Sequence, residues 1–100
     1  MPVMLEIGMT ATPILIHPEI SYGDLFSMVR EQGRSRDPDF DKIKLNSLYV
    51  IWNRGGDSRS FPEKSKVDQE NLNATLALLK IRQGRDVLRA DYEFNRDTLV

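Results

Sequence analysis

The chain contains no cysteine and a single histidine, His17. Disulfide bonds and thiolate metal sites are therefore impossible within it, and a reducing compartment is compatible with its composition. A metal site with several histidine ligands also cannot form within one copy of the chain, because it has a single histidine. We therefore expect no cofactor and a cytoplasmic or nuclear location.

Long hydrophobic runs and an excess of one charge are missing as well. The longest apolar runs have about five residues, whereas a membrane-spanning helix needs about 20. Fourteen basic residues stand against fifteen acidic ones, for a net charge of −1. Broad nucleic-acid binding needs a basic surface that displaces counterions. We therefore expect no membrane partner and regard a nucleic-acid partner as disfavoured.

The remaining composition is that of one folded domain. The chain has 100 residues, of which 40% are hydrophobic and 29% are charged, as in ordinary globular domains. We assign residues 1–94 to a single domain and residues 95–100 to a flexible tail.

The first third of the chain predicts a β-hairpin followed by a helix. Hydrophobic and polar residues alternate from position 3, which favours a hairpin over residues 3–17 with the TATP segment as its turn. Pro13 would then begin the second strand, where its missing N–H matters least. Ser21 is a suitable N-cap for a helix over residues 21–32, and Gly33 is the expected left-handed residue after its end.

The second half predicts two strands, a helix and a last strand. After a loop over residues 33–46, the SLYVIW segment is typical of a strand inside a sheet. A Gly-Gly turn leads to a return strand over residues 58–61, which Pro62 ends, and a charged link follows. Asp68 is the predicted N-cap of the second helix and Gly84 its stop signal. Its buried stripe is Leu72, Leu76 and Leu79. Residues 88–94 alternate again as a final strand.

The predicted order is therefore ββαββαβ, which indicates a two-layer α+β domain. With a long helix between the second and third strands, residues 3–94 resemble the ubiquitin-like β-grasp fold. The resemblance implies a mixed sheet with its first and last strands parallel at the centre and its helices on one face.

The full helix directly before the last strand is similar to that of Phox/Bem-type heterodimerisation domains. Those domains carry an acidic motif on the turn and strand before the second helix and on its first turn. The matching positions here are Gly56-Asp57, Asp68 and Glu70, with Glu63 between them. The same turn holds Arg54 and Arg59 where that family has more carboxylates, and the segment corresponding to the first strand lacks the family's lysine.

The leading hypothesis is a non-catalytic scaffold or adaptor module of a larger intracellular protein. It would bind another protein domain with a basic surface through an acidic turn–helix surface, or through a sheet edge. The candidate binding residues are Arg54, Asp57, Glu63, Asp68 and Glu70. The alternative interpretation of the acidic residues is a solvated turn with a helix cap. Self-association is also open.

A different function class is a small RNA-binding or ribosome-associated domain. Its surface would be the basic loop 30–40, in which Arg30, Arg34 and Arg36 precede the aromatic Phe40. The simpler interpretation of the same residues is a solvated loop. A small enzyme is the third class, with Asp37, Asp39 and Asp41 as its carboxylates. No nucleophile or phosphate-binding glycine loop accompanies them, so we expect no enzyme.

The second helix has a further apolar stripe. Ala74, Leu78 and Ile81 lie away from the leucine stripe on a helical wheel. They would either form a face for another chain or widen the stripe that fills a small core.

Overall fold

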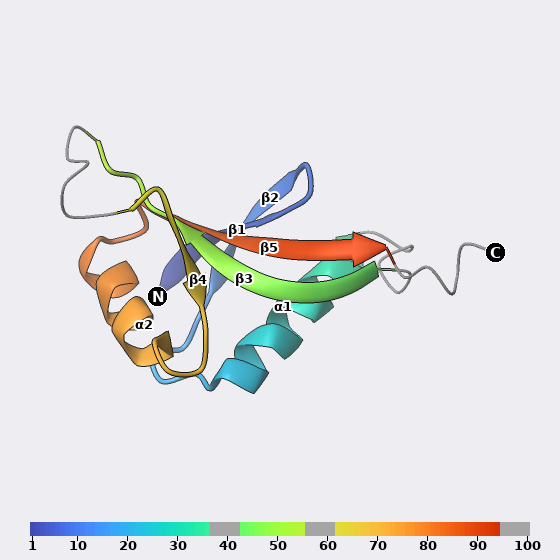
Figure 1. Cartoon of the computed structure of the whole chain (residues 1–100), viewed down its shortest axis with the longest axis horizontal. Helices are drawn as coiled ribbons and strands as arrows, with labels where there is room; N and C mark the ends of the chain where they lie inside the picture. The colour runs from blue at the N-terminus through green and yellow to red at the C-terminus, as the bar shows by residue number, and fades with distance from the viewer. Residues whose placement is uncertain (37–42, 56–61, 95–100) are drawn as a thin grey trace.

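The computed structural model describes residues 1–36, 43–55 and 62–94, apart from the side chains at positions 36, 43, 93 and 94. Its elements are β1 (Pro2–Ile7), β2 (Thr10–Leu15), α1 (Tyr22–Arg36), β3 (Ile43–Ile51), β4 (Lys64–Val67), α2 (Leu72–Ile81) and β5 (Val87–Phe94) (Figure 1). The predicted element order and the mixed α+β class are confirmed.

The strands form one mixed sheet in the order β2-β1-β5-β3-β4. β1 and β5 run parallel, with Leu5 beside Leu88. The other neighbouring strands are antiparallel. The two strands farthest apart in the sequence therefore lie side by side within the sheet, as the resemblance led us to expect.

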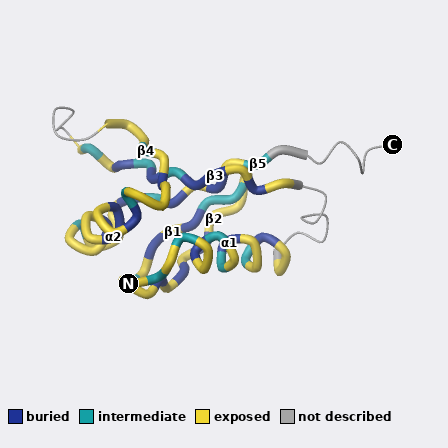
Figure 2. Tube along the Cα trace, turned by 60° about the horizontal axis from the view of Figure 1, so that its bottom comes forward, coloured by how far each residue is buried: buried dark blue, intermediate teal, exposed yellow. Residues whose placement is uncertain are grey.

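The core lies between one face of this sheet and the two helices. Side chains alternate along a strand, so Leu5, Leu48, Val50 and Leu88 point to the same face, and each is at most 1% exposed. The helices contribute Leu25, Val29, Leu72, Leu76 and Leu79 to the same cluster. Figure 2 shows both helices on one side of the sheet with their buried positions turned inward. Burying one such side chain stabilises the fold by about 1.5–3 kcal/mol.

The first hairpin turns earlier than predicted. Gly8 and Met9 connect the strands, and Gly8 has a φ of +59°, which glycine adopts readily in tight hairpin turns. The TATP segment is therefore part of β2 and not the turn. Pro13 lies within β2 opposite Met4, and the outer position of β2 in the sheet tolerates a proline there.

α1 begins as predicted but ends later. The Asp24 N–H donates to Ser21 Oγ over 3.1 Å, which confirms the N-cap. Gly33, the predicted stop, lies inside the helix and is buried. It follows Leu25 and Val29 at four-residue spacing on the inner side, and packing of that side outweighs the cost of about 1 kcal/mol for a helical glycine. The predicted basic loop is thus helical as far as Arg36.

β3 and the strand that follows it in the sequence also differ from the prediction. β3 itself begins at Ile43, inside the predicted loop. The predicted return strand over residues 58–61 falls outside the described residues, and the segment assigned to a charged link forms β4. Its single buried residue, Val67, pairs with Leu48, while Lys64 and Lys66 point to the other face.

α2 begins four positions after its predicted N-cap. The Asn71 N–H donates to Asp68 Oδ1 over 2.8 Å, and the Asp68 N–H donates to Asn71 Oδ1 over 3.0 Å. This reciprocal pair, similar to a capping box, holds the turn that precedes Leu72. The predicted leucine stripe is buried. The stop comes one residue earlier than predicted, because Arg82 is the C-cap and Gln83, with a φ of +54°, is the left-handed residue after it; Gly84 follows with a φ of +80°.

A buried ion pair fixes the chain between α2 and β5. Asp86, which is 1% exposed, accepts hydrogen bonds from Arg82 Nε over 2.7 Å and from the Asn53 N–H over 2.8 Å. Arg82 also donates to the Asn53 carbonyl and lies over the Trp52 ring. The hydrogen bond that Arg82 donates to Asp86 raises the pKa of Arg82. The network therefore ties the end of α2 to the end of β3.

Candidate functional site

No described helix or strand covers the sheet face opposite the helices, and an apolar row crosses it. Pro13 lies beside Met4, Met4 beside Val87, and Val87 beside Ile51. Lys64 of β4 ends the row. Because neighbouring strands are about 4.8 Å apart, the row is about 19 Å long. Pro13 and Met4 are exposed, whereas Val87 and Ile51 are half-buried.

A mixed row lies next to it. It runs from Ala11 through Glu6, Arg89 and Tyr49 to Lys66. Arg89 Nε donates to Glu6 Oε1 over 2.8 Å, so these two charges offset each other. Leu15, at the end of β2, is 74% exposed. We name the two rows and Leu15 together the open face.

The β4 end of the open face is cationic. Lys64 and Lys66 are both exposed there. The Lys64 ammonium lies 5.0 Å from the centre of the Tyr49 ring, a cation–π contact that holds it over the face. The open face thus presents apolar side chains in its middle and positive charge at one side.

The β2 edge of the sheet is protected against strand addition. The N–H and C=O of Ile16 both bond to Met1. Since such pairs alternate in an antiparallel ladder, the backbone groups of Ala11, Pro13 and Leu15 are the ones that point outward. Proline has no N–H, so the middle position of this edge offers no donor to an added strand.

The β4 edge is short and partly occupied. The Trp52 N–H donates to the Glu63 carbonyl, so the backbone groups of Lys64 and Lys66 point outward by the same alternation. Asn71 Nδ2 already donates to the Lys66 carbonyl over 2.8 Å. Neither edge is therefore a long free template for a partner strand.

The predicted acidic residues do not form one cluster among the described residues. Glu63 and Asp68 stand at opposite ends of β4, about 16 Å apart at about 3.3 Å per residue. Asp68 is engaged with Asn71, and only Glu70 lies close to it in the turn before α2. Asp57 lies outside the described residues, and Arg54 is half-buried. The acidic binding surface stays a prediction.

The basic residues of the alternative hypothesis lie on a helix. Arg30 and Arg34 are exposed one turn apart on α1, with Glu31 between them. The Arg36 side chain and Phe40 lie outside the described residues, as do Asp37, Asp39 and Asp41 of the enzyme hypothesis. Within the part of the chain that the structure describes, no three His, Asp or Glu side chains gather as metal ligands.

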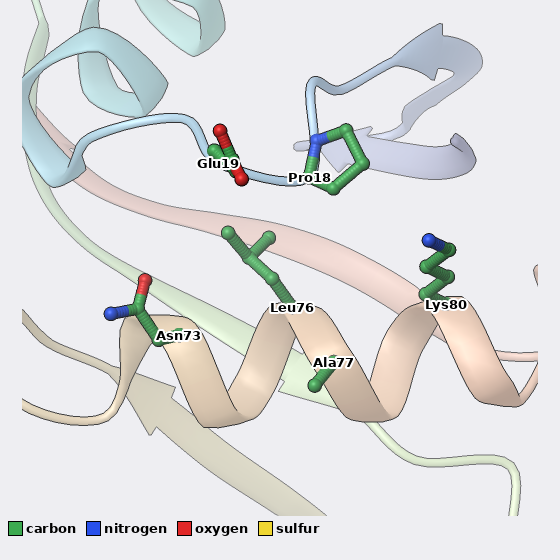
Figure 3. A pocket seen from close by; sticks show the side chains of 6 residues that line it. All are labelled: Pro18, Glu19, Asn73, Leu76, Ala77 and Lys80. Carbon is green, nitrogen blue, oxygen red and sulfur yellow. The ribbon is translucent and has the colours of Figure 1, made fainter.

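A shallow hollow of about 500 Å³ lies between α2 and the segment that precedes α1. In Figure 3, Leu76 and Lys80 point from α2 toward the segment that carries Pro18 and Glu19. The hollow contains one acidic and one basic group and no buried polar side chain, so it does not resemble a catalytic pocket. The exposed His17 accepts the Glu19 N–H through Nδ1, a local structural role.

The start of α1 and the turn before α2 interact electrostatically. Burial raises the pKa of Tyr22, and the Asp68 carboxylate raises it further.

No helix in the described ranges is long and apolar enough to cross a bilayer.

Sequence reasoning missed two features. The open-face row depends on which residues become neighbours across strands, and alternation within one strand does not contain that register. Asp86 was missed because an Asp between an Arg and an apolar strand has the pattern of an ordinary turn residue. The four-residue spacing from Arg82 was the available signal.

Comparison with known proteins assigns no family. The sequence matches no model of a known protein family, and a search of curated proteins finds no significantly similar sequence.

Proposed function

We propose that this chain is a protein–protein interaction module of the β-grasp type that binds its partner on the open face. Support for the fold assignment comes from the element order, the strand order β2-β1-β5-β3-β4 and the parallel β1–β5 pair. Support for the binding role comes from a single observation, the uncovered apolar row from Pro13 to Ile51. Contiguous exposed apolar patches on small domains commonly mark interaction sites.

The open face is a better docking surface than either of the two predicted ones. A sheet edge would offer few free backbone groups, because Pro13 interrupts one edge and Asn71 occupies part of the other. The acidic residues are divided between the two ends of β4, with exposed lysines between them. A partner with a basic surface would therefore meet mixed charge there. The open face instead combines apolar area with the positive charge of Lys64 and Lys66 at one side, while its Glu6 and Arg89 charges offset each other.

The chemistry of the open face defines the partner. The partner's apolar side chains would cover the row around Met4 and Val87. The partner's carboxylates would lie near Lys64 and Lys66, where complementary charge speeds and orients docking. Interfaces of this kind have an apolar centre and a polar rim. The partner we expect is thus a protein segment or domain that presents apolar and acidic groups together.

The test is a competition experiment. The immobilised chain captures proteins from a lysate, and soluble wild-type chain or a variant is added as competitor. Met4→Glu places a charge in the middle of the row, and we expect its affinity for the captured protein to fall by at least about 10-fold, since central hot-spot residues are worth about 2 kcal/mol or more. Ser27→Glu, on the exposed side of α1, is the matched control and should compete as well as wild type.

The competing surface is tested in the same format. Glu63→Lys and Glu70→Lys reverse the exposed acidic residues without removing the Asp68 turn. If these variants lose the captured protein while Met4→Glu retains it, the open-face proposal fails and the acidic surface replaces it.

A further inference from the structure

α2 is apolar on the side that faces solvent as well as on the side that faces the core. Leu72, Leu76 and Leu79 are buried against the sheet. Ala74 and Ala77 are exposed, and so are Leu78 at 38% and Ile81 at 75%. The interpretation that the second stripe fills the core is therefore wrong for Leu78 and Ile81. Asn73 and Lys80 are its exposed polar residues, so the exposed apolar residues form a second stripe on the helix, and exposed apolar patches commonly mark interaction sites.

The exposed residues form one continuous stripe. Ala74, Leu78 and Ile81 follow each other at i, i+4 and i+7, and Ala77 lies beside them. The stripe is about 10 Å long at a rise of about 1.5 Å per residue. Figure 2 shows α2 at one end of the molecule with exposed positions on its outer side. Within the described part of the chain, neither α1 nor a strand covers that side.

We propose that a second copy of this chain covers the stripe, with the two α2 helices packed antiparallel about a twofold axis near Ala77 and Leu78. This arrangement places Ile81 of each copy against Ala74 of the other, and Leu78 against Ala77. Each large side chain then meets a small one, as ridges-into-grooves packing requires. A twofold interface needs such self-complementarity.

The charges around the stripe favour the antiparallel direction. Asp68 and Glu70 lie at the start of α2, whereas Lys80 and Arg85 lie at its end, and all four are exposed. Antiparallel packing brings the acidic end of one copy to the basic end of the other, and it also opposes the two helix dipoles. Parallel packing would place like charges together and Ile81 against Ile81.

The dimer is expected to be weak. One helix of ten residues per copy provides less area than the 1,200–2,000 Å² or so of a stable interface. The measurement is therefore sedimentation equilibrium of the purified full chain from about 10 μM to about 1 mM, a range suited to small transient interfaces. The average mass should rise from 11.5 kDa toward twice that value.

Leu78→Glu should leave the mass at that of the monomer over the whole range, with an unchanged circular dichroism spectrum. Leu15→Glu, an exposed leucine of the open face, is the matched control and should associate like wild type. Glu70→Arg and Arg85→Glu should each weaken association, and the double variant should restore it.

A wild-type chain that remains monomeric at about 1 mM overturns the proposal. Association that survives Leu78→Glu overturns it too. A double charge reversal that fails to restore association rules out the antiparallel arrangement. None of these outcomes bears on partner binding at the open face, which lies on the other side of the sheet from α2.

Discussion

The two faces of the sheet carry neighbouring rows of similar apolar character, but the described helices cover only one of them. The covered row runs from Thr12 through Leu5, Leu88 and Val50 to Ser65. The open row, displaced by one residue along each strand, runs from Pro13 through Met4, Val87 and Ile51 to Lys64. The central residues of the covered row are at most 1% exposed, whereas Met4 is 38% exposed.

The difference between the rows separates two uses of apolar residues. The covered row is closed at both ends by small polar side chains and lies beneath the helices, so its residues stabilise the fold. The open row ends in a lysine, and none of the helices and strands in residues 1–36, 43–55 and 62–94 covers it. Its apolar residues contribute less to folding, and partner binding is the role that we propose for them.

The largest effect is expected at the end of the covered face. Asp86→Ala removes the carboxylate that accepts hydrogen bonds from Arg82 and from the Asn53 N–H, and breaking a buried ion pair costs about 3–5 kcal/mol. Asp91→Ala, on the open side of the same strand, removes only a 3.5 Å contact with Ser47, so its cost should be under about 1 kcal/mol. Urea unfolding measures the free energy of unfolding of both variants. Equal losses in the two variants would contradict the expected difference between the two sides of the strand.

The two rows can be compared directly at neighbouring positions of β1. Leu5→Ala removes a fully buried side chain and should lower the free energy of unfolding by about 2–5 kcal/mol. Met4→Ala should cost under about 1 kcal/mol, because much of its side chain is already in water. Thermal and urea unfolding provide the measurement. A comparable cost at Met4 would mean that the open row also belongs to the core.

High pH should weaken the covered side through Tyr22. Because burial raises the pKa of Tyr22 in the folded state above its usual value of about 10, the folded protein holds this proton more tightly than the unfolded chain does. The contribution of Tyr22 to the free energy of unfolding is therefore complete below about pH 10 and is lost as the pH rises further. Unfolding experiments across this range should show a loss that Tyr22→Phe abolishes. Asp68→Asn should lower the pKa of Tyr22 by less than exposing the ring would.

The smallest effect is expected from the ion pair on the open face. Glu6 and Arg89 are partly exposed, so the pair is screened and should contribute about 0–1 kcal/mol. Glu6→Gln should therefore change the free energy of unfolding far less than Asp86→Ala, and added salt should reduce even that change. A loss of several kcal/mol would show that this pair acts as a buried one.

Most helices and strands could be predicted from the sequence, whereas the tertiary contacts and the register of strand pairing between them could not. Periodicity predicted both helices, the leucine stripe of α2 and the alternating last strand, and Ser21 predicted the start of α1, because these signals are local. The length of α1 was mispredicted because a tertiary contact outweighed a local signal, as buried Gly33 shows. The turn at Gly8 was mispredicted although its signal, a glycine with positive φ, is local. β4 was missed because Lys-Ser-Lys-Val has only one buried residue.

The candidate site was harder to predict than the fold. Glu63, Asp68 and Glu70 looked like one group in the sequence, but the length of β4 separates Glu63 from the other two. Met4, Val87 and Ile51 are distant in the sequence and become neighbours only through the strand order. A surface made by register across strands has no signature in a single segment. The exposed stripe of α2 was visible in advance because it lies on one helix.

The most direct test of partner binding on the open face is a nuclear magnetic resonance titration of the labelled chain with the protein identified by competition capture. We predict that the amide signals of Met4, Ile51, Lys64 and Val87 shift or broaden first, while those on the exposed side of α1 stay in place. Changes confined to α1, or to the turn that holds Asp68 and Glu70, would contradict the account.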